Sequence, residues 1–580
     1  MKRKAILWLI LLCTALILLS CDNSTPPNGT VTDCGAVTDT QPEQTDISID
    51  IVKDGVAQYR IVRGEEADQV VVDAAVMIRE KIGSVTGVTP DIGTDWVRRG
   101  TDLDHTAFEI LIGDTAYPES DKAMEDLPYG DYIITQVDNK LVINSRSKEG
   151  MNRAVARFLN MLTLQGKEGN FSLPGDVRYT ETAVEIVNCL PQYTDGDLLT
   201  IYPAGDRAQL LVCTDTTPEA YADYRKKLEA AGYVLHTETV ITDNLFATYA
   251  NDQYVVHAGY YAYEKAVRLT IEPRKALPAL PADNQYTASI QPSVAMLGLE
   301  FEGKQNGLCL VFQLADGSYI IVDGGFNRTR DAQSLYEYMY AHAPDPSNIT
   351  IAGWFITHSH SDHHGAFLSF CQNYGAQVTV EYVIANFPST EARLEGGVND
   401  GAGGSTIVST AEKLRGTQFI KAHTGYIFHM RDAKIEILYT HESFAPRILS
   451  YYNTSSLIFT VDLAGQRFMV LGDASHDAGK IAQSMYGSYL KSDIIQTAHH
   501  GYTTGSTVYS GITGLYTKAA APVVLWPLGD QTYPSMSSRA FSRHLQELST
   551  TKEIFVAGSR DIRLMLPYTY GTSGYPSILN

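Results

Sequence analysis

A short window near the middle of the chain holds the side chains best suited to chemistry. The window His358–His364 contains four of the 15 histidines in the 580-residue sequence, together with Asp362. Imidazole nitrogens and carboxylate oxygens are ligands that suit zinc. His358 and His360 can direct their rings toward one point, while Asp362 and His363 can face a second point nearby. The spacing therefore predicts two metal ions, which about 3.5–4 Å apart can hold a hydroxide between them.

The elements around this window must place it on a turn. The apolar run 351–356 is typical of a buried strand, and residues 365–374 can form a helix that Gly375 closes. The window then lies between the end of a strand and the start of a helix. The alternative interpretation is a solvated polar turn, in which the clustered histidines bind no metal.

Three other polar segments follow apolar runs and offer partners for the window. Asp323–Gly325 follows the second of two strand-like runs joined at residues 315–317, Gly472–Asp473 follows residues 468–471, and His499–Gly501 follows residues 493–497. Together with the polar turn at Asn453, these segments resemble the metallo-β-lactamase superfamily in order and spacing, over about residues 290–580. The resemblance implies an αβ/βα sandwich with its metals at the strand ends on one edge.

The resemblance also implies a role for each residue of the window. His358 and His360 would bind the first metal, Asp362 and His363 the second, and Asp473 would bridge the two. Two divalent ions are expected, with Zn²⁺ favoured and Mn²⁺ or iron as alternatives. Hydrolysis would then proceed by a metal-bridging hydroxide, with Asp362, Asp473, His364 and Asn453 as the catalytic residues.

One of the adjacent residues His499 and His500 would complete the second metal site. Neighbouring residues on an extended segment point in opposite directions, so only one of them can bind readily, and we favour His500. The other would contact the substrate or orient its neighbour. Asp323 is expected to orient the ligands from behind rather than to bind metal. His364 and His476 are candidates for substrate contact, although a structural histidine is the alternative for each.

The sequence departs from the superfamily pattern at one ligand. A histidine usually lies about twenty residues before the bridging aspartate, but Asn453 occupies that place here, with His441 and His429 as alternatives. An amide oxygen is a poorer zinc ligand than imidazole, so the first site would be weaker. Asn453-x-x-Ser-Leu together with His-His-Gly resembles the branch that contains the nuclease-like domain of bacterial DNA-uptake channels and surface phosphorylcholine esterases.

The N-terminus predicts export and a lipid anchor. Lys2–Lys4 precede an apolar stretch, and Leu18–Cys21 resembles a bacterial lipobox, so residues 1–20 are expected to be a lipoprotein signal peptide with Cys21 lipidated. An ordinary cleaved signal or an uncleaved anchor is the alternative. Residues 21–46 are polar and predict a flexible tether. The expected location is the bacterial cell surface or periplasm, with a lipid anchor in the membrane.

Three folded units are expected after the tether, which gives an α/β and α+β multidomain protein. Residues 47–183 resemble the N-terminal accessory α/β domain of several glycoside hydrolases through Ile110–Gly113, Gly130–Ile134 and Gly150–Ala154. Residues 184–287 predict a second small α/β domain, and residues 288–580 the sandwich. The net charge of −21 argues against strong nucleic-acid binding. The oligomeric state is not predicted.

These observations predict a surface-anchored dinuclear hydrolase of phosphodiester or phosphoester bonds. Its substrate would be a small molecule or a cell-envelope polymer. A metallo-hydrolase of amide, lactam or thioester bonds is one alternative, because the fold does not determine the bond. A non-catalytic glycan-binding surface lipoprotein is the other.

Overall fold

The computed structural model describes residues 48–580 except 99, 126, 129–130, 176, 182–185, 206, 300–306, 399, 402, 503–509 and 580. The expected signal peptide, the tether and the lipidated Cys21 lie outside the described residues. Among the helices that are described, none has both the length and the apolar character needed to cross a membrane.

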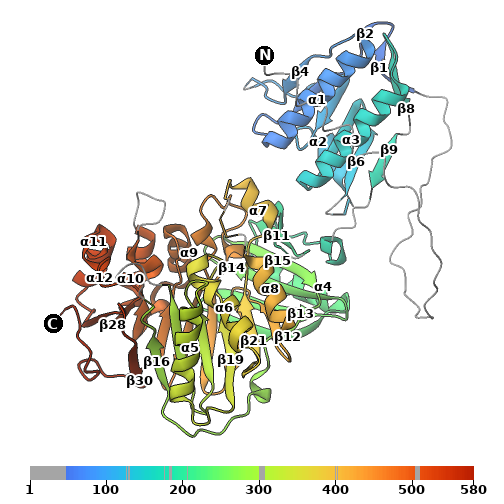
Figure 1. Cartoon of the computed structure of the whole chain (residues 1–580). Helices are drawn as coiled ribbons and strands as arrows, with labels where there is room; N and C mark the ends of the chain where they lie inside the picture. The colour runs from blue at the N-terminus through green and yellow to red at the C-terminus, as the bar shows by residue number, and fades with distance from the viewer. Residues whose placement is uncertain are drawn as a thin grey trace, which may run out of the picture.

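The first unit, residues 48–181, is a mixed sheet with helices on both faces (Figure 1). Its main sheet has the order β4-β3-β5-β7-β6-β9, and a smaller sheet has the order β2-β1-β8. Helices α1 and α3 share one core with the main sheet, whereas α2 packs on the other face. The strands are β1 (Ser48–Lys53), β2 (Val56–Ala57), β3 (Arg60–Arg63), β4 (Ile92–Thr94), β5 (Glu109–Ile112), β6 (Tyr132–Val137), β7 (Lys140–Ser145), β8 (Phe171–Pro174) and β9 (Arg178–Glu181), and the helices are α1 (Gln69–Thr86), α2 (Pro118–Met124) and α3 (Lys148–Gln165).

Helical periodicity explains α1. Its buried residues Ala75, Ile78, Ile82 and Thr86 recur three or four positions apart, so one stripe of the helix faces the core. The helix ends where Gly87 adopts a left-handed conformation, with φ of 73°, and its N–H bonds back to the carbonyl of Gly83.

The second unit is one antiparallel sheet covered by a single α-helix among its described residues. The strand order is β10-β11-β15-β14-β13-β12, and α4 packs on one face through a core that includes Tyr221, Tyr224 and Leu228. The elements are β10 (Asp197–Pro203), β11 (Gln209–Thr214), α4 (Pro218–Ala230), β12 (Val234–Ile241), β13 (Asn244–Ala250), β14 (Tyr254–Tyr261) and β15 (Ala266–Pro273), with short 3₁₀ turns η1 (Ile186–Cys189) and η2 (Pro281–Asp283).

The third unit contains two sheets that face each other. The first has the order β22-β21-β19-β18-β17-β16-β30, with β20 beside β19, and the second runs β23 to β29 in sequence order. The strands of the first are β16 (Ser293–Met296), β17 (Cys309–Gln313), β18 (Tyr319–Asp323), β19 (Ile349–Phe355), β20 (Val378–Val380), β21 (Tyr382–Ala385), β22 (Gln418–Lys421) and β30 (Ile562–Met565). Those of the second are β23 (Ile427–Met430), β24 (Ala433–Tyr439), β25 (Ile458–Leu463), β26 (Gln466–Val470), β27 (Ile494–Gln496), β28 (Val523–Trp526) and β29 (Glu553–Val556).

Helices cover the outer face of each sheet. The first sheet shares a core with α5, α6 and α8, and the second with α9, α10 and α12. The helices are α5 (Thr329–His342), α6 (Ser361–Tyr374), α7 (Thr390–Glu395), α8 (Gly404–Lys413), α9 (His476–Tyr486), α10 (Ser510–Ala519), α11 (Tyr533–Ser537) and α12 (Ala540–Glu547), and the 3₁₀ turns are η3 (His441–Ser443), η4 (Tyr452–Ser455), η5 (Gly487–Leu490) and η6 (Ala498–Gly501). The layers are therefore helix, sheet, sheet and helix, which confirms the expected αβ/βα sandwich.

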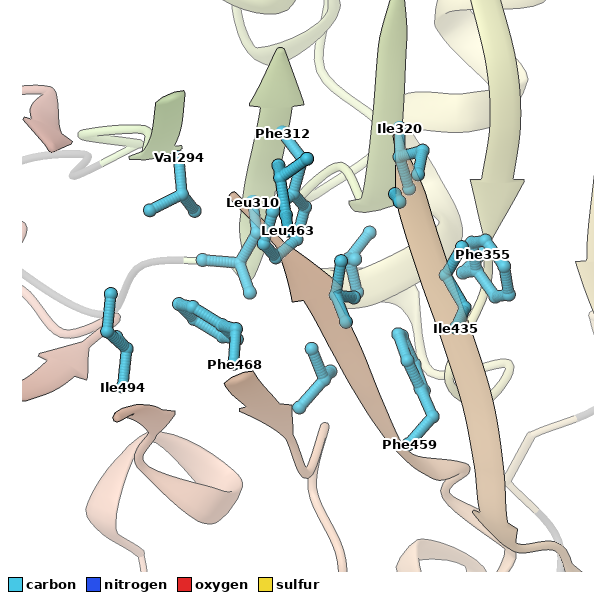
Figure 2. Packing of buried hydrophobic residues seen from close by; sticks show 14 of the residues in the cluster. Val294, Leu310, Phe312, Ile320, Phe355, Ile435, Phe459, Leu463, Phe468 and Ile494 are labelled. Atoms are coloured by element: carbon cyan, nitrogen blue, oxygen red, sulfur yellow. The ribbon is translucent and has the colours of Figure 1, made fainter. Parts of the chain in front are cut away.

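The space between the two sheets is filled by apolar side chains from both. Figure 2 shows Phe312, Ile320 and Phe355 from the first sheet facing Phe459 and Phe468 from the second. The rings of Phe355 and Phe459 stack with centroids 5.1 Å apart. These contacts hold the sheets together and so fix the strand ends relative to each other.

Buried polar contacts join the second unit to the third. Lys421 lies 3.6 Å from Glu272 and 3.1 Å from Glu442, and its ammonium donates to the carbonyl of Ala204 at 2.9 Å. His423 lies between the same two glutamates. Burial lowers the pKa of this histidine, but Glu442 and Glu272 outweigh burial and raise the pKa to about 8. Charges buried away from water require partners of opposite sign, so the two units depend on each other here.

We predict that Phe459→Ala destabilises the sandwich by about 3–5 kcal/mol, because it leaves a cavity between the sheets. Urea unfolding followed by tryptophan fluorescence measures the loss. Tyr570→Ala is the control, since that side chain is 56% exposed, and we expect a change of about 0.5 kcal/mol or less. Equal losses in both variants would contradict the packing described here.

Candidate metal centre

The polar segments identified in the sequence meet where parallel strands of the two sheets end. In the first sheet, β18 ends at Asp323, and β19 leads through residues 356–360 into α6. In the second sheet, β26 leads to Asp473 and β27 to His500. The sheets approach so closely here that a Cβ on Gly472 would lie 2.7 Å from the side chain of Thr357. Gly472 also has a left-handed backbone, with φ of 52°. Only glycine fits this position without displacing its neighbour.

Two groups of potential ligands form at this junction. The first group consists of His358, His360 and Asp473, and the second group of Asp362, His363, Asp473 and His500. Within each group the ligand atoms all lie within 4.8 Å of one another. Asp473 belongs to both, with Oδ1 lying 3.1 Å from His363 Nε2 and Oδ2 lying 4.0 Å from His358 Nε2. Each oxygen of this carboxylate therefore faces a different group.

The distances within the second group match a metal coordination sphere. Nε2 of His500 lies 3.3 Å from Nε2 of His363 and 3.6 Å from carboxylate oxygens of Asp362 and Asp473. Ligands about 2.0–2.1 Å from a tetrahedral ion lie roughly 3.3 Å from one another. The distances from His500 to the other three donors, 3.3–3.6 Å, are close to the separation that one zinc ion requires.

Hydrogen bonds behind the rings fix which nitrogen of each histidine faces the second group. His363 Nδ1–H donates to Asp323 at 2.7 Å, and His500 Nδ1–H donates to the carbonyl of Pro527 at 2.8 Å. Both Nε2 atoms then present lone pairs to each other at 3.3 Å. Two facing lone pairs repel unless a cation lies between them. A proton can take that place, because the pKa of His363 is raised, but a proton joins only two of the four donors.

The first group shows the same arrangement. His358 Nδ1–H donates to Thr357 Oγ1 at 3.1 Å, and His360 Nε2–H donates to Asp400 at 3.1 Å. His358 Nε2 and His360 Nδ1 then face each other at 3.0 Å. The chemistry of the donors in both groups therefore fits a pair of metal ions.

Asp323 orients the donors from behind. It is fully buried, and its carboxylate accepts hydrogen bonds from the backbone N–H of Thr357, the hydroxyl of Thr357 and Nδ1–H of His363. Through Thr357 it also fixes the ring of His358. Its φ of 57° is left-handed, a strain that the surrounding hydrogen bonds hold in place.

Neighbouring charges determine the proton affinities of the centre. Burial lowers the pKa of His358 well below its usual value. Burial opposes the charged form of Asp473, yet His363, His499 and His500 lower the pKa of this carboxyl well below its usual range. Burial likewise disfavours protonated His363, but Asp473, Asp323 and Asp362 raise its pKa well above the ordinary value. The carboxylates of Asp473, Asp323 and Asp362 therefore stabilise positive charge at His363.

Our geometric premise for His499 and His500 is wrong. The two residues are not extended but left-handed, with φ of 47° and 50°. This kink turns the fully buried His500 into the four-residue group. His499 stays outside it, with Nε2 lying 3.6 Å from Asp473 Oδ2 and a side chain that is 20% exposed.

The other sequence candidates lie beside the two groups. His364 Nδ1–H donates to the carbonyl of His360 at 2.8 Å, and His476 Nδ1 accepts from the N–H of Ile512 at 3.4 Å. Asn453 donates to the hydroxyl of Tyr451, and its Oδ1 is buried without a hydrogen-bond partner. That amide oxygen is a donor atom of the kind that a metal could use.

Neither alternative to Asn453 reaches the two groups. Nε2 of His441 bonds to Asn386 Oδ1 at 2.8 Å, and His429 lies on β23. Neither belongs to a group of potential ligands found among the described residues.

Sequence reasoning missed several residues that support the centre. Thr357 links Asp323 to His358, Asp400 binds His360, and the hydroxyl of Tyr452 lies 2.5 Å from that of Ser359. Thr357 directly precedes the histidine window, which is a usable local signal. Asp400 and Tyr452 are distant in sequence, and no local pattern indicates them.

In comparisons of the whole chain with known proteins, the family match falls in the third unit. A search of curated proteins gives no significant match. Solved structures that match include the metallo-beta-lactamase fold protein YhfI from Bacillus subtilis, at 12% identity and a TM-score of 0.31, covering 46% of this chain and 98% of that one. They also include CmlA, a diiron beta-hydroxylase from Streptomyces venezuelae, at 14% identity and a TM-score of 0.29, covering 51% and 55%.

A third matching structure is a candidate metal-dependent hydrolase from Parabacteroides distasonis, at 15% identity and a TM-score of 0.27, covering 48% of this chain and 99% of that one. Residues 303–519 match the family model described as the metallo-beta-lactamase superfamily. They include the window at 358–364, Asp473 and both histidines at 499–500. Residues 303–519 of this chain therefore form a metallo-beta-lactamase superfamily domain.

Proposed function

We propose that this protein is a dinuclear hydrolase of phosphodiester or phosphoester bonds, held at the bacterial surface by a lipid on Cys21. Metal-dependent hydrolysis accompanies the superfamily domain. The bond, the anchor and the residue roles are the proposal. Resemblance of the segments around Asn453 and His499–Gly501 to phosphoesterase branches supports the choice of bond.

One observation carries the proposal of a metal pair. Each group contains two imidazole nitrogens that face each other at 3.0 Å or 3.3 Å while their other ring nitrogens donate elsewhere. Asp473 offers one oxygen to each group. Nitrogen and carboxylate donors suit zinc, with manganese or iron as alternatives where the Asn453 amide takes the place of an imidazole.

Bound metals would supply a water activated near neutral pH and positive charge opposite the negative charge that develops during hydrolysis. The protein's own residues hold that arrangement in place. His358 and His360 define one position, Asp362, His363 and His500 the other, and Asp473 spans both.

His499 and Tyr451 would contact the substrate. The side chain of His499 is 20% exposed, and its Nδ1 is a buried atom without a hydrogen-bond partner. Tyr451 is partly buried, and the charges of Asp473 and Asp400, together with burial, raise the pKa of its phenol. Its hydroxyl therefore stays protonated at neutral pH and can donate to an oxyanion.

We predict that full-length wild-type protein binds two equivalents of zinc and that Asp473→Ala binds less than one, because both positions share that carboxylate. Mass spectrometry of metal content after gel filtration measures the difference. His429→Ala is the control, because this histidine lies on β23 outside both groups. Two equivalents retained in Asp473→Ala would exclude the bridging role.

We predict that Asp323→Asn weakens zinc binding by about 10–100-fold, because an amide no longer fixes the hydrogen-bonding nitrogens of His363 and His358. Competition with a fluorescent chelator measures the affinity. Asp323 acts through other residues, so the variant should change affinity at an unchanged stoichiometry. A wild-type affinity in this variant would contradict the positioning role.

We predict that the zinc- or manganese-loaded protein hydrolyses an aryl phosphodiester with a kcat/KM at least about tenfold above that for a lactam, a thioester or an amide, which corresponds to roughly 1.4 kcal/mol of transition-state discrimination. A panel of chromogenic substrates makes the comparison. A preference for lactam, thioester or amide would favour the alternative metallo-hydrolase. If the protein hydrolyses none of these substrates and binds less than one equivalent of metal, the result would favour a glycan-binding lipoprotein.

A further inference from the structure

A separate cavity lies between the second and third units. Its volume is about 180 Å³, and its lining includes Ala204, Gly205 and Lys275 from the second unit and Arg393, Phe419 and Lys421 from the third. This is roughly ten times the space that one ordered water needs, and it is smaller than the roughly 300–1,000 Å³ typical of whole-ligand pockets. The cavity therefore has the size for one chemical group of a larger molecule.

The cavity is lined by positive charge. Lys275, Arg393 and Lys421 all contribute to it, and among the described residues of the lining none is Asp or Glu. The whole chain has a net charge of −21, so such a local excess of cations runs against its composition. Lys421 is balanced from beneath by Glu272 and Glu442. Arg393 donates to the carbonyls of Val398 and Asp400, which carry no charge.

Backbone dipoles and hydroxyls add to this positive character. Helix α8 begins beside the cavity, with Gly404 and Ser405 in the lining. No side chain caps the helix, and its first turn contains no acidic residue. The first N–H groups of a helix lack partners within it and favour anions. Ser389 and Thr390 add hydroxyl groups to the lining.

The loop before α8 joins this cavity to the metal centre. Gly401 lines the cavity, and its carbonyl accepts a hydrogen bond from Ser359, which lies between two of the metal-centre histidines. Asp400 accepts from His360 through its side chain and from Arg393 through its carbonyl. The loop at residues 400–401 therefore contacts both the wall of the cavity and the segment that carries the metal-centre histidines.

We infer that this cavity binds a second oxyanion of the substrate, a phosphate or a carboxylate, while the bond to be hydrolysed lies at the metal centre. The inference rests on the proposed function and narrows its substrate class to phosphoesters that carry a further anionic group. Arg393 and Lys275 bind the oxyanion directly, and the start of α8 and the hydroxyls complete the site. The second unit thereby gains a role, because it supplies Lys275 and the backbone at residues 204–205.

Two variants test the site without relying on catalysis. Full-length protein treated with a chelator is titrated calorimetrically with inorganic phosphate and, separately, with acetate. We expect Lys275→Gln or Arg393→Gln to weaken the binding of at least one of these anions about tenfold or more, at an unchanged thermal midpoint, since a charged hydrogen bond contributes at least this much. Lys491→Gln removes an exposed charge elsewhere and is the matched control.

The two anions distinguish the chemical source. Dependence of phosphate binding alone on these residues assigns a phosphate site, and dependence of acetate binding assigns a carboxylate site. The inference is overturned if the two variants bind both anions as tightly as Lys491→Gln does. It is also overturned if the wild-type chain binds neither anion. This titration stands even if the protein hydrolyses no phosphoester, so its failure is distinct from that of the proposed function.

A kinetic comparison then links the cavity to the metal centre. The metal-loaded protein is assayed with an aryl phosphodiester and with the same compound carrying an additional carboxylate or phosphate. In Lys275→Gln we expect the KM for the compound with the additional anionic group to rise about tenfold relative to the KM for the parent phosphodiester. An unchanged ratio would show that the cavity does not serve the substrate.

Discussion

Repulsion between imidazole lone pairs is the interaction on which the centre depends. In each group, hydrogen bonds behind the rings commit one nitrogen of each histidine and leave the other facing its counterpart at 3.0 Å or 3.3 Å. Such an arrangement is costly unless a cation relieves it. The protein accepts this cost because β18, β19, β26 and β27 end at one junction, and the apolar layer between the sheets prevents the strand ends from separating.

Local pattern was sufficient to predict part of the fold and part of the centre. The sandwich layers were implied by the resemblance of several segments to the superfamily, whereas the helix after the histidine window follows from the pattern of one segment. Residues 358–363 were predictable for the same reason, since they lie on a single turn between a strand and a helix.

What could not be predicted depends on contacts between distant segments. Asp400 lies forty positions from His360, and Tyr452 more than ninety from Ser359, so only the folded chain brings them together. The left-handed backbone at His499 and His500 was also missed, because histidines adopt it only where surrounding structure enforces it. The cavity lined by Lys275, Arg393 and Lys421 could not be predicted either, because these residues come from three separate segments of the chain.

The buried contacts between the second and third units have a consequence for dissecting the protein. Glu272 on β15 lies against Lys421 and His423 of the sandwich, and Nε2–H of His257 donates to the carbonyl of Thr424 at 2.8 Å. A fragment that starts at the sandwich would lose Glu272 and would expose Lys421 and His423 with Glu442 as the remaining carboxylate beside them. Truncations and gene fusions should therefore keep the second and third units together, because the buried charges of one are partnered by the other.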